Sequence, residues 1–264
     1  AFCAVPIAGA WRSGFRFRPN LDRSDPDVRN LARQGAWAAI FLAMTQVLLG
    51  AVLVIGNQVE GGIVGYQVAF TFFLLPHALF ALPVLNTLYP DAARKAQAGD
   101  RDGVAVTVQR GVRAISFFVL PVAAALIALA RPAASLALFR ESAAGVDLVV
   151  AALVGFAPGL VGYGIFYFLS RIFYALDDTH TPALVHAAVV AVGVVAMVVS
   201  TAATDEAGVI GALAWSHSIT YLLGAGALLV LVVRRLRPHP PAVGRTLLTG
   251  VAAAAAAGLV MAGV

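Results

Sequence analysis

Repeated blocks of about 20 apolar residues constrain the fold of this chain more than any other feature. A bilayer core about 30 Å thick is crossed by roughly 20 apolar residues of α-helix at about 1.5 Å per residue. Stretches that meet or approach this length, and that we expect to span a membrane, are 35–56, 61–88, 114–130, 148–170, 182–203, 207–233 and 246–264. Membrane strands would alternate apolar and polar residues, whereas these blocks are continuously apolar, so helices are expected.

The composition supports an all-α, polytopic transmembrane helix bundle. Apolar residues make up 61% of the chain and charged residues 12%, against about 45–50% and about 25% in soluble domains. These values exclude a soluble enzyme, a disordered chain and a nucleic-acid-binding domain. The one cysteine, Cys3, excludes a disulfide framework.

The basic residues predict the orientation of the spans. Sorted by connecting loop, 16 of the 18 Lys and Arg residues fall on the side of the N-terminal segment, and only Arg131 and Arg140 fall on the other. The positive-inside rule then places residues 1–34 in the cytoplasm. We expect residues 1–34 to be a cytoplasmic connector, 35–236 a six-helix transmembrane lobe, and 237–264 a cytoplasmic turn and a truncated further span. The polar stretch 91–113 could lie as an interfacial helix.

Polar side chains inside the spans are the first candidates for function, because burying them in lipid is costly. Gln67 and Thr71 lie four residues apart, on one face of the second span. They either line a transport cavity or make hydrogen bonds between helices. Interhelical hydrogen bonding is also the simpler interpretation for Gln46, His77 and His217.

The fourth span ends in GYGIFYFLSRIFYAL, where Tyr163, Tyr167 and Arg171 recur every four residues and form one stripe. The stripe is either an aromatic interface belt with a snorkelling arginine, or a site where Arg171, with Tyr167 beside it, binds an anionic lipid headgroup. A guanidinium suits a phosphate because it can donate two parallel hydrogen bonds.

Two further motifs concern helix starts and bends. In the sequence DDTHTP, Pro182 suits the first turn of the fifth span, and Asp178 or Thr179 can cap that helix; Thr181 belongs to the same motif. Pro76 and Pro83 lie seven residues apart in the second span, where kinks could serve alternating access or only packing.

Three stretches together resemble the MurJ/MviN lipid II flippase family. They are LPHALFALPVLNTLYPDAARKAQAGDRDG at 75–103, SRIFYALDDTHTP at Ser170–Pro182, and AGVIGALAWSHSITYLLGAGALLVLVVRRL at 207–236. The resemblance implies the fold of the multidrug/oligosaccharidyl-lipid/polysaccharide exporters, in which two six-helix lobes surround a central cavity. Residues 35–233 would be the second lobe, followed by the start of an additional helix. The first lobe is then missing, and we expect the chain to be part of a longer membrane protein.

The sequence departs from that family at several positions. Thr71 and Leu74 stand where many members carry an arginine and an acid, and Ala51 and Gly193 or Val194 stand nearest to the sodium ligands of some members. These residues cannot supply such groups through their side chains.

The resemblance implies movement of an undecaprenyl-pyrophosphate-linked peptidoglycan precursor across the bacterial inner membrane, with that lipid-linked precursor, the missing lobe and membrane lipids as partners. Alternatives are a transport-inactive scaffold of cell-wall synthesis, or an exporter of another polyprenyl-linked glycan or a drug. No nucleophile–base pair, metal-ligand spacing or phosphate loop is present in the sequence. We therefore expect a transporter with no catalytic residues, no metal, no cofactor and no nucleic-acid partner.

Overall fold

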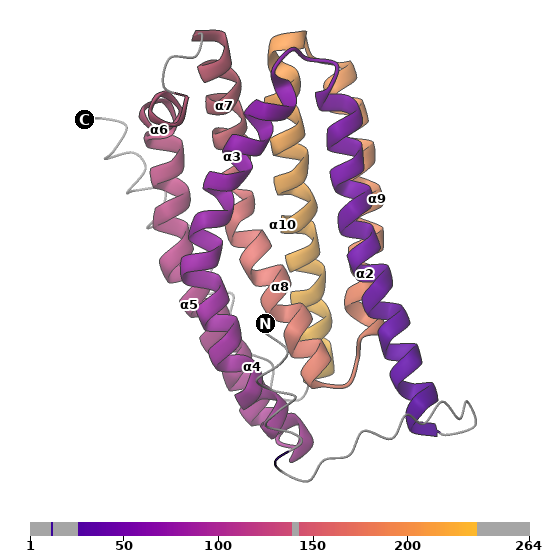
Figure 1. The fold of residues 1–264 in the computed structure, drawn as a ribbon. Helices are drawn as coiled ribbons and strands as arrows, with labels where there is room; N and C mark the ends of the chain where they lie inside the picture. The colour runs from indigo at the N-terminus through magenta and orange to yellow at the C-terminus, as the bar shows by residue number, and fades with distance from the viewer. Residues whose placement is uncertain (1–11, 13–25, 139–142, 237–264) are drawn as a thin grey trace. The chain divides into compact units, whose positions relative to one another are not determined.

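The computed structural model describes residues 12, 26–138 and 143–236, which are almost wholly helical and contain no β-strand (Figure 1). In chain order the elements are α2 (Pro26–Gly56), α3 (Gly62–Pro76), the π-helical segment η1 (His77–Ala81), α4 (Leu82–Gln97), α5 (Arg101–Ala128), α6 (Ala130–Ala137), α7 (Ala143–Phe156), α8 (Gly159–Ala175), α9 (His180–Ala202), the 3-10 turn η2 (Glu206–Gly208) and α10 (Val209–Arg235). The all-α class expected from the sequence is confirmed.

The chain divides into two compact units, residues 1–36 and residues 37–264. In the first unit, residues 26–36 form the beginning of α2, where Arg33 donates a hydrogen bond of 3.0 Å to Asn30. Residues 26–34, which the sequence assigned to a connector, are thus already helical. The second unit holds the remaining helices and all the contacts described below.

Most of the expected spans correspond to helices of membrane-crossing length. Within the described residues, α2, the continuous run α3–η1–α4, α5, α9 and α10 are each long and apolar enough to cross a bilayer. Large apolar side chains point outward along them, and Phe117 of α5 is 71% exposed and Val195 of α9 is 61% exposed. Such surfaces suit contact with lipid tails. The expected span at 246–264 lies outside the described residues.

The expected span at 148–170 corresponds to two helices, α7 and α8, which are bent by 50° and together are long and apolar enough to cross a bilayer. Pro158 stands at the break and has no backbone N–H to continue the helix. Ser218 of α10 replaces the lost bonds, since its hydroxyl donates to the Gly155 carbonyl at 2.6 Å and accepts from the Gly159 N–H at 3.1 Å. A neighbouring helix therefore satisfies the broken backbone.

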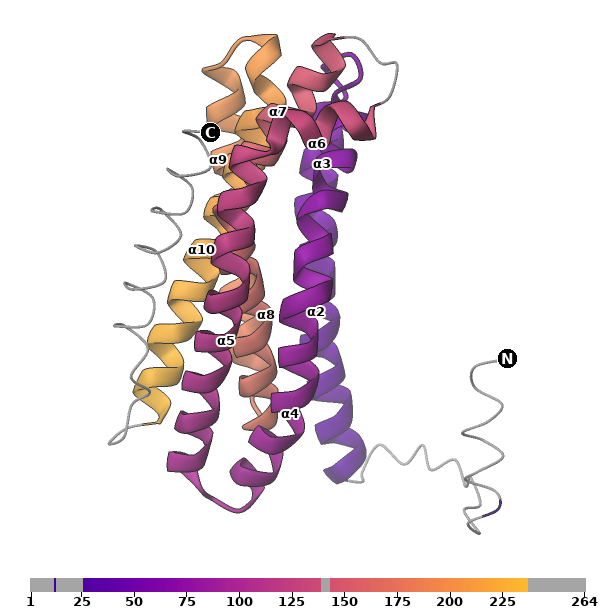
Figure 2. The ribbon, with the colours of Figure 1, turned by 90° about the vertical axis from the view of Figure 1, so that its left-hand side faces the viewer.

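The expected interfacial helix at 91–113 is wrong. Helices α4 and α5 instead run on past their apolar parts and meet at a turn over residues 98–100 (Figure 2). The run α3–η1–α4 contains 36 residues, about 54 Å of helix at about 1.5 Å per residue. This length exceeds a bilayer core of about 30 Å, so the hairpin projects beyond it.

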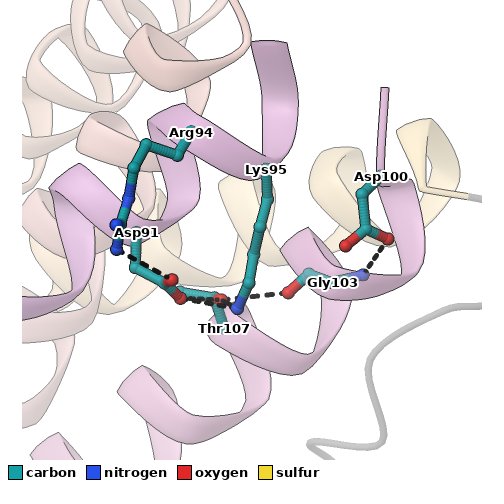
Figure 3. A network of polar contacts seen from close by, with 6 residues as sticks. All are labelled: Asp91, Arg94, Lys95, Asp100, Gly103 and Thr107. Atoms are coloured by element: carbon teal, nitrogen blue, oxygen red, sulfur yellow. Dashed lines mark hydrogen bonds and ion pairs between the residues drawn. The ribbon is translucent and has the colours of Figure 1, made fainter. Parts of the chain in front are cut away.

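A polar network holds the two helices of this hairpin together (Figure 3). Lys95 of α4 forms an ion pair with Asp91 and donates at 2.9 Å to the hydroxyl of Thr107 on α5, which is fully buried. The Thr107 hydroxyl lies 3.0 Å from the Asp91 carboxylate and 2.9 Å from the Gly103 carbonyl, its two possible acceptors. Hydrogen bonds from Lys95 and then Thr107 lower the pKa of Asp91, which lies beyond the apolar part of the span.

The centre of the second unit is the packing of α8 against α10. Phe166, Leu169 and Leu228 are fully buried there. A Cβ added at Gly162 of α8 would lie 2.8 Å from the backbone nitrogen of Leu222 on α10. Only glycine permits so close an approach of two backbones, which is a common way for helices to associate in membranes.

Candidate functional site

A cavity of about 120 Å³ lies between α2 and α3, and we name it the α2–α3 cavity. Its side walls come from α2 and α3, and its floor comes from Tyr163 of α8 and from His217 and Tyr221 of α10. Figure 1 shows α10 running between α3 and α2. None of the lining residues is an Asp, Glu, Lys or Arg. The cavity is therefore an uncharged, partly aromatic site at membrane depth.

The two polar residues that the sequence placed on one face of the second span lie one turn apart on α3 and differ in their contacts. Gln67 is exposed and lines the α2–α3 cavity. Thr71 is also exposed, but its hydroxyl donates at 2.9 Å to the Gln67 backbone carbonyl, within the same helix. In the described part of the chain, the Gln67 side chain makes no hydrogen bond, so its amide is available to a ligand.

A buried hydrogen bond joins the wall of this cavity to its floor. The hydroxyl of Tyr66, on α3, lies 3.3 Å from Nδ1 of His217 on α10. The two residues are 4% and 6% exposed. Nε2 of His217 is buried and has no hydrogen-bond partner among the described residues, which is uncommon for a buried polar atom.

Aromatic rings surround the Tyr66–His217 pair and fix its position. The Tyr163 and Tyr221 ring centroids lie 4.7 Å apart, and those of His217 and Tyr221 lie 4.9 Å apart. The role of Tyr66 and Tyr221 is not evident from the sequence, because tyrosine is common in membrane helices. The one sequence feature that pointed to this cluster was the adjacent polar pair His217–Ser218 within an apolar span.

The stripe of Tyr163, Tyr167 and Arg171 on α8 divides into two environments. Tyr163 and Tyr167 are half-buried with ring centroids 4.7 Å apart, so they belong to the aromatic cluster. Arg171 is exposed, and its guanidinium carbon lies 5.9 Å from the ring centroid of Tyr89 on α4. This distance is typical of a cation–π contact. The structure therefore places Arg171 beside Tyr89, at the end of the bundle where α8 terminates.

The motif DDTHTP forms the junction between α8 and α9. Asp178 accepts hydrogen bonds from the Thr181 N–H at 2.9 Å and from the Thr181 hydroxyl at 2.8 Å. Thr179 is the N-cap residue by position but makes no capping bond with its side chain, and Pro182 falls in the first turn of α9. Asp178 also pairs with Arg235 of α10 at 3.2 Å, so one carboxylate caps α9 and holds the end of α10.

Pro76 and Pro83 flank the π-helical segment η1. Pro76 is the last residue of α3 and Pro83 is the second residue of α4. A proline cannot donate the N–H that an α-helix requires in its interior, and π-turns often absorb such interruptions. The second span thus carries a local widening rather than a break.

Comparison with known proteins identifies the family to which the chain belongs. The fold and the uncharged intramembrane cavity define a multi-pass helical membrane protein without a soluble catalytic domain in its described part. The family model "Lipid II flippase MurJ" matches residues 2–264, so the chain belongs to the lipid II flippase MurJ family.

Individual relatives agree with this membership. A "Probable lipid II flippase MurJ" of Rhizobium meliloti (strain 1021) is 32% identical over 196 residues, which cover 72% of this chain and 35% of that protein. One of Rhizobium tropici is 28% identical over 234 residues, covering 88% and 43%. A solved structure, "Lipid II flippase MurJ, inward closed conformation", superposes with a TM-score of 0.64 at 19% identity, over 86% of this chain and 50% of that one.

These coverages show that the chain spans about two fifths of the length of the curated relatives it matches. The similarity to the solved structure supports the fold, since the sequence identity is low.

Proposed function

We propose that this chain forms the second lobe of a lipid II flippase, which moves the undecaprenyl-pyrophosphate-linked peptidoglycan precursor to the outer leaflet. The observation that carries the proposal is the family match over residues 2–264. The match favours neither a transport-inactive scaffold nor an exporter of another glycan or drug. The proposed protein is a transporter and not an enzyme.

The proposed location is the bacterial inner membrane, with residues 1–34 in the cytoplasm. The arrangement of charges supports this orientation. Arg94 and Arg101 flank the α4–α5 turn, and Arg235 ends α10, at the same end of the bundle (Figure 2). Arg131 of α6 lies at the opposite end, where it pairs with Asp147 at 2.8 Å. An excess of basic residues at one end is typical of the cytoplasmic side.

The mechanism follows from placing this lobe against a first lobe. Two lobes that rock about a site near the bilayer midplane expose it alternately to either side. Gln67 and Thr71 then face the transport path, and Tyr167 packs against Tyr163, which lies on the floor of the α2–α3 cavity. Arg171 stands at the cytoplasmic mouth, where its guanidinium can bind the pyrophosphate as the headgroup enters. The two prolines around η1 allow the second span to adjust during rocking.

Depletion of the full-length natural protein tests this function. In cells without another flippase, the amount of lipid II accessible at the outer leaflet should fall, and wild-type protein should restore it. Arg171→Ala should fail to restore it, whereas Arg131→Ala at the opposite end should restore it fully. An unchanged level of accessible lipid II after depletion would contradict the proposed function.

A further inference from the structure

The α2–α3 cavity shows which part of a lipid-linked headgroup this lobe can accept. Its lining contains no ionised Asp, Glu, Lys or Arg side chain. Moving a charged pyrophosphate into such surroundings without a partner charge costs far more than moving a neutral polar group. A ligand group that enters this cavity should therefore be uncharged.

The polar groups of the cavity suit an amide. The free Gln67 side chain offers both an N–H donor and a carbonyl acceptor, and it lines the cavity. His217 lines the same cavity and retains one ring nitrogen without a partner in the described part of the chain. An acylamino group presents the complementary N–H and C=O together, so it can pair with Gln67 through both.

The aromatic walls suit the methyl group of such a substituent. Tyr66, Phe70 and Tyr163 all line the cavity. The ring centroids of Tyr66 and Phe70 lie 6.2 Å apart, and Tyr163 packs against Tyr221 at 4.7 Å, so the rings are held in place before a ligand arrives. A preorganised apolar wall with a few polar groups is the usual composition of a small-molecule site.

The volume limits the occupant to a substituent. The cavity, at about 120 Å³, is smaller than the roughly 300–1,000 Å³ that is usual for a drug-sized ligand. It therefore suits a substituent of the size of an acetamido group better than a whole headgroup.

We propose that the α2–α3 cavity binds an N-acetyl substituent on the sugars of the lipid-linked precursor, with Gln67 as the residue that pairs with the amide. The inference rests on the proposed function, because lipid II carries N-acetylated sugars next to its pyrophosphate. It makes Gln67 a specificity residue for the sugar, separate from the phosphate-binding role proposed for Arg171.

The test measures the affinity of the purified full-length protein for three probes: lipid II, N-deacetylated lipid II and undecaprenyl pyrophosphate. Gln67→Leu should weaken binding of lipid II about tenfold, in line with the loss of paired hydrogen bonds, and leave the affinity for undecaprenyl pyrophosphate unchanged. Wild type should bind deacetylated lipid II about tenfold more weakly than lipid II, and Gln67→Leu should show no such difference between these two probes.

Gln46→Leu is the matched control, because Gln46 is an exposed intramembrane glutamine of α2 that does not line the cavity. It should bind all three probes as wild type does. The inference is overturned if Gln67→Leu binds lipid II as wild type does, or if it loses affinity for undecaprenyl pyrophosphate to the same extent. A wild-type protein that binds lipid II no better than undecaprenyl pyrophosphate overturns the inference alone, whereas one that binds neither also contradicts the proposed function.

Discussion

The contact between α8 and α10 at Gly162 gives the sharpest prediction for stability. In Gly162→Ala the new methyl carbon would lie 2.8 Å from the backbone nitrogen and 2.9 Å from the Cα of Leu222. Both atoms belong to a helix backbone, so no side-chain rotation can relieve the overlap. The helices must separate by roughly half an ångström to reach ordinary contact distances, which loosens the best-packed interface of the lobe.

The expected magnitude follows from two opposing effects. Overpacking of a close-packed interior costs about 1–3 kcal/mol, and replacing a helical glycine with alanine returns about 1 kcal/mol of helix propensity. Because the overlap is with two backbone atoms that cannot rotate away, we expect the upper part of the overpacking range, about 2–3 kcal/mol, and so a net loss of about 1–2 kcal/mol. In a chain of this size each kcal/mol lowers the melting temperature by about 2–4 °C, so the melting temperature should fall by about 2–8 °C.

The assay is thermal unfolding of the detergent-solubilised protein, with Gly226→Ala of α10 as the matched control. A Cβ at Gly226 meets nothing within 4 Å, so this variant keeps the gain in helix propensity and should melt at or slightly above the wild-type temperature. If Gly162→Ala melts at or above the wild-type temperature as well, the close approach of α8 and α10 is refuted.

Three further changes test other parts of the structure by the same melting assay. Asp178→Ala removes the cap of α9 and the pair with Arg235 and should cost about 1–2 kcal/mol; destabilisation no larger than that of an exposed control such as Glu60→Ala would contradict the capping role. Ser218→Ala removes the hydroxyl that bridges the broken backbone and should cost about 1–3 kcal/mol, whereas an unchanged melting temperature would show that the break does not depend on it. Asp91→Asn should destabilise the protein at neutral pH. Because the pKa of Asp91 is lowered in the folded state, its contribution to stability is present above about pH 4 and is lost as the pH falls through the lowered pKa. The difference in melting temperature between wild type and variant should therefore shrink in acid. A difference that does not depend on pH would refute the role of the Asp91 network.

The span pattern was predictable from the sequence because it depends on local composition. A run such as 182–203 must be helical in lipid wherever its neighbours lie, and α9 covers almost the same residues. The break at Pro158 was not predictable in the same way. Several prolines occur inside the apolar runs, and nothing in the sequence near Pro158 sets it apart from the others. Pro158 separates two helices because Ser218, on another helix, bonds to the backbone on both sides of the break.

The α4–α5 hairpin is a second feature that the sequence predicts only in part. The charges between 91 and 113 indicate a segment outside the membrane, which the structure agrees with. Whether such a segment lies flat or continues its helices depends on a pairing twelve residues apart, between Lys95 and Thr107. No local sequence pattern predicts that contact.

The candidate site was only partly predictable for a related reason. Gln67 stood out because an amide in an apolar span is costly, and it does line the cavity. The contact of Tyr66 with His217 joins residues 151 positions apart in the chain, so it appears only once α3 and α10 are placed. Arg171 and Tyr167 share a stripe on the helix, yet the arginine contacts Tyr89 of a different helix.

Photo-crosslinking in the full-length natural protein tests the central claim, that this lobe presents its α2–α3 face to lipid II during transport. A photoreactive amino acid is placed at Gln67 or at Phe117, which is 71% exposed on the outer surface of α5, and covalent adducts with radiolabelled lipid II are measured in membranes that flip it. The account predicts a lipid II adduct at position 67 and none above background at position 117. Equal labelling at the two positions, or no labelling at position 67 while flipping proceeds, would contradict it.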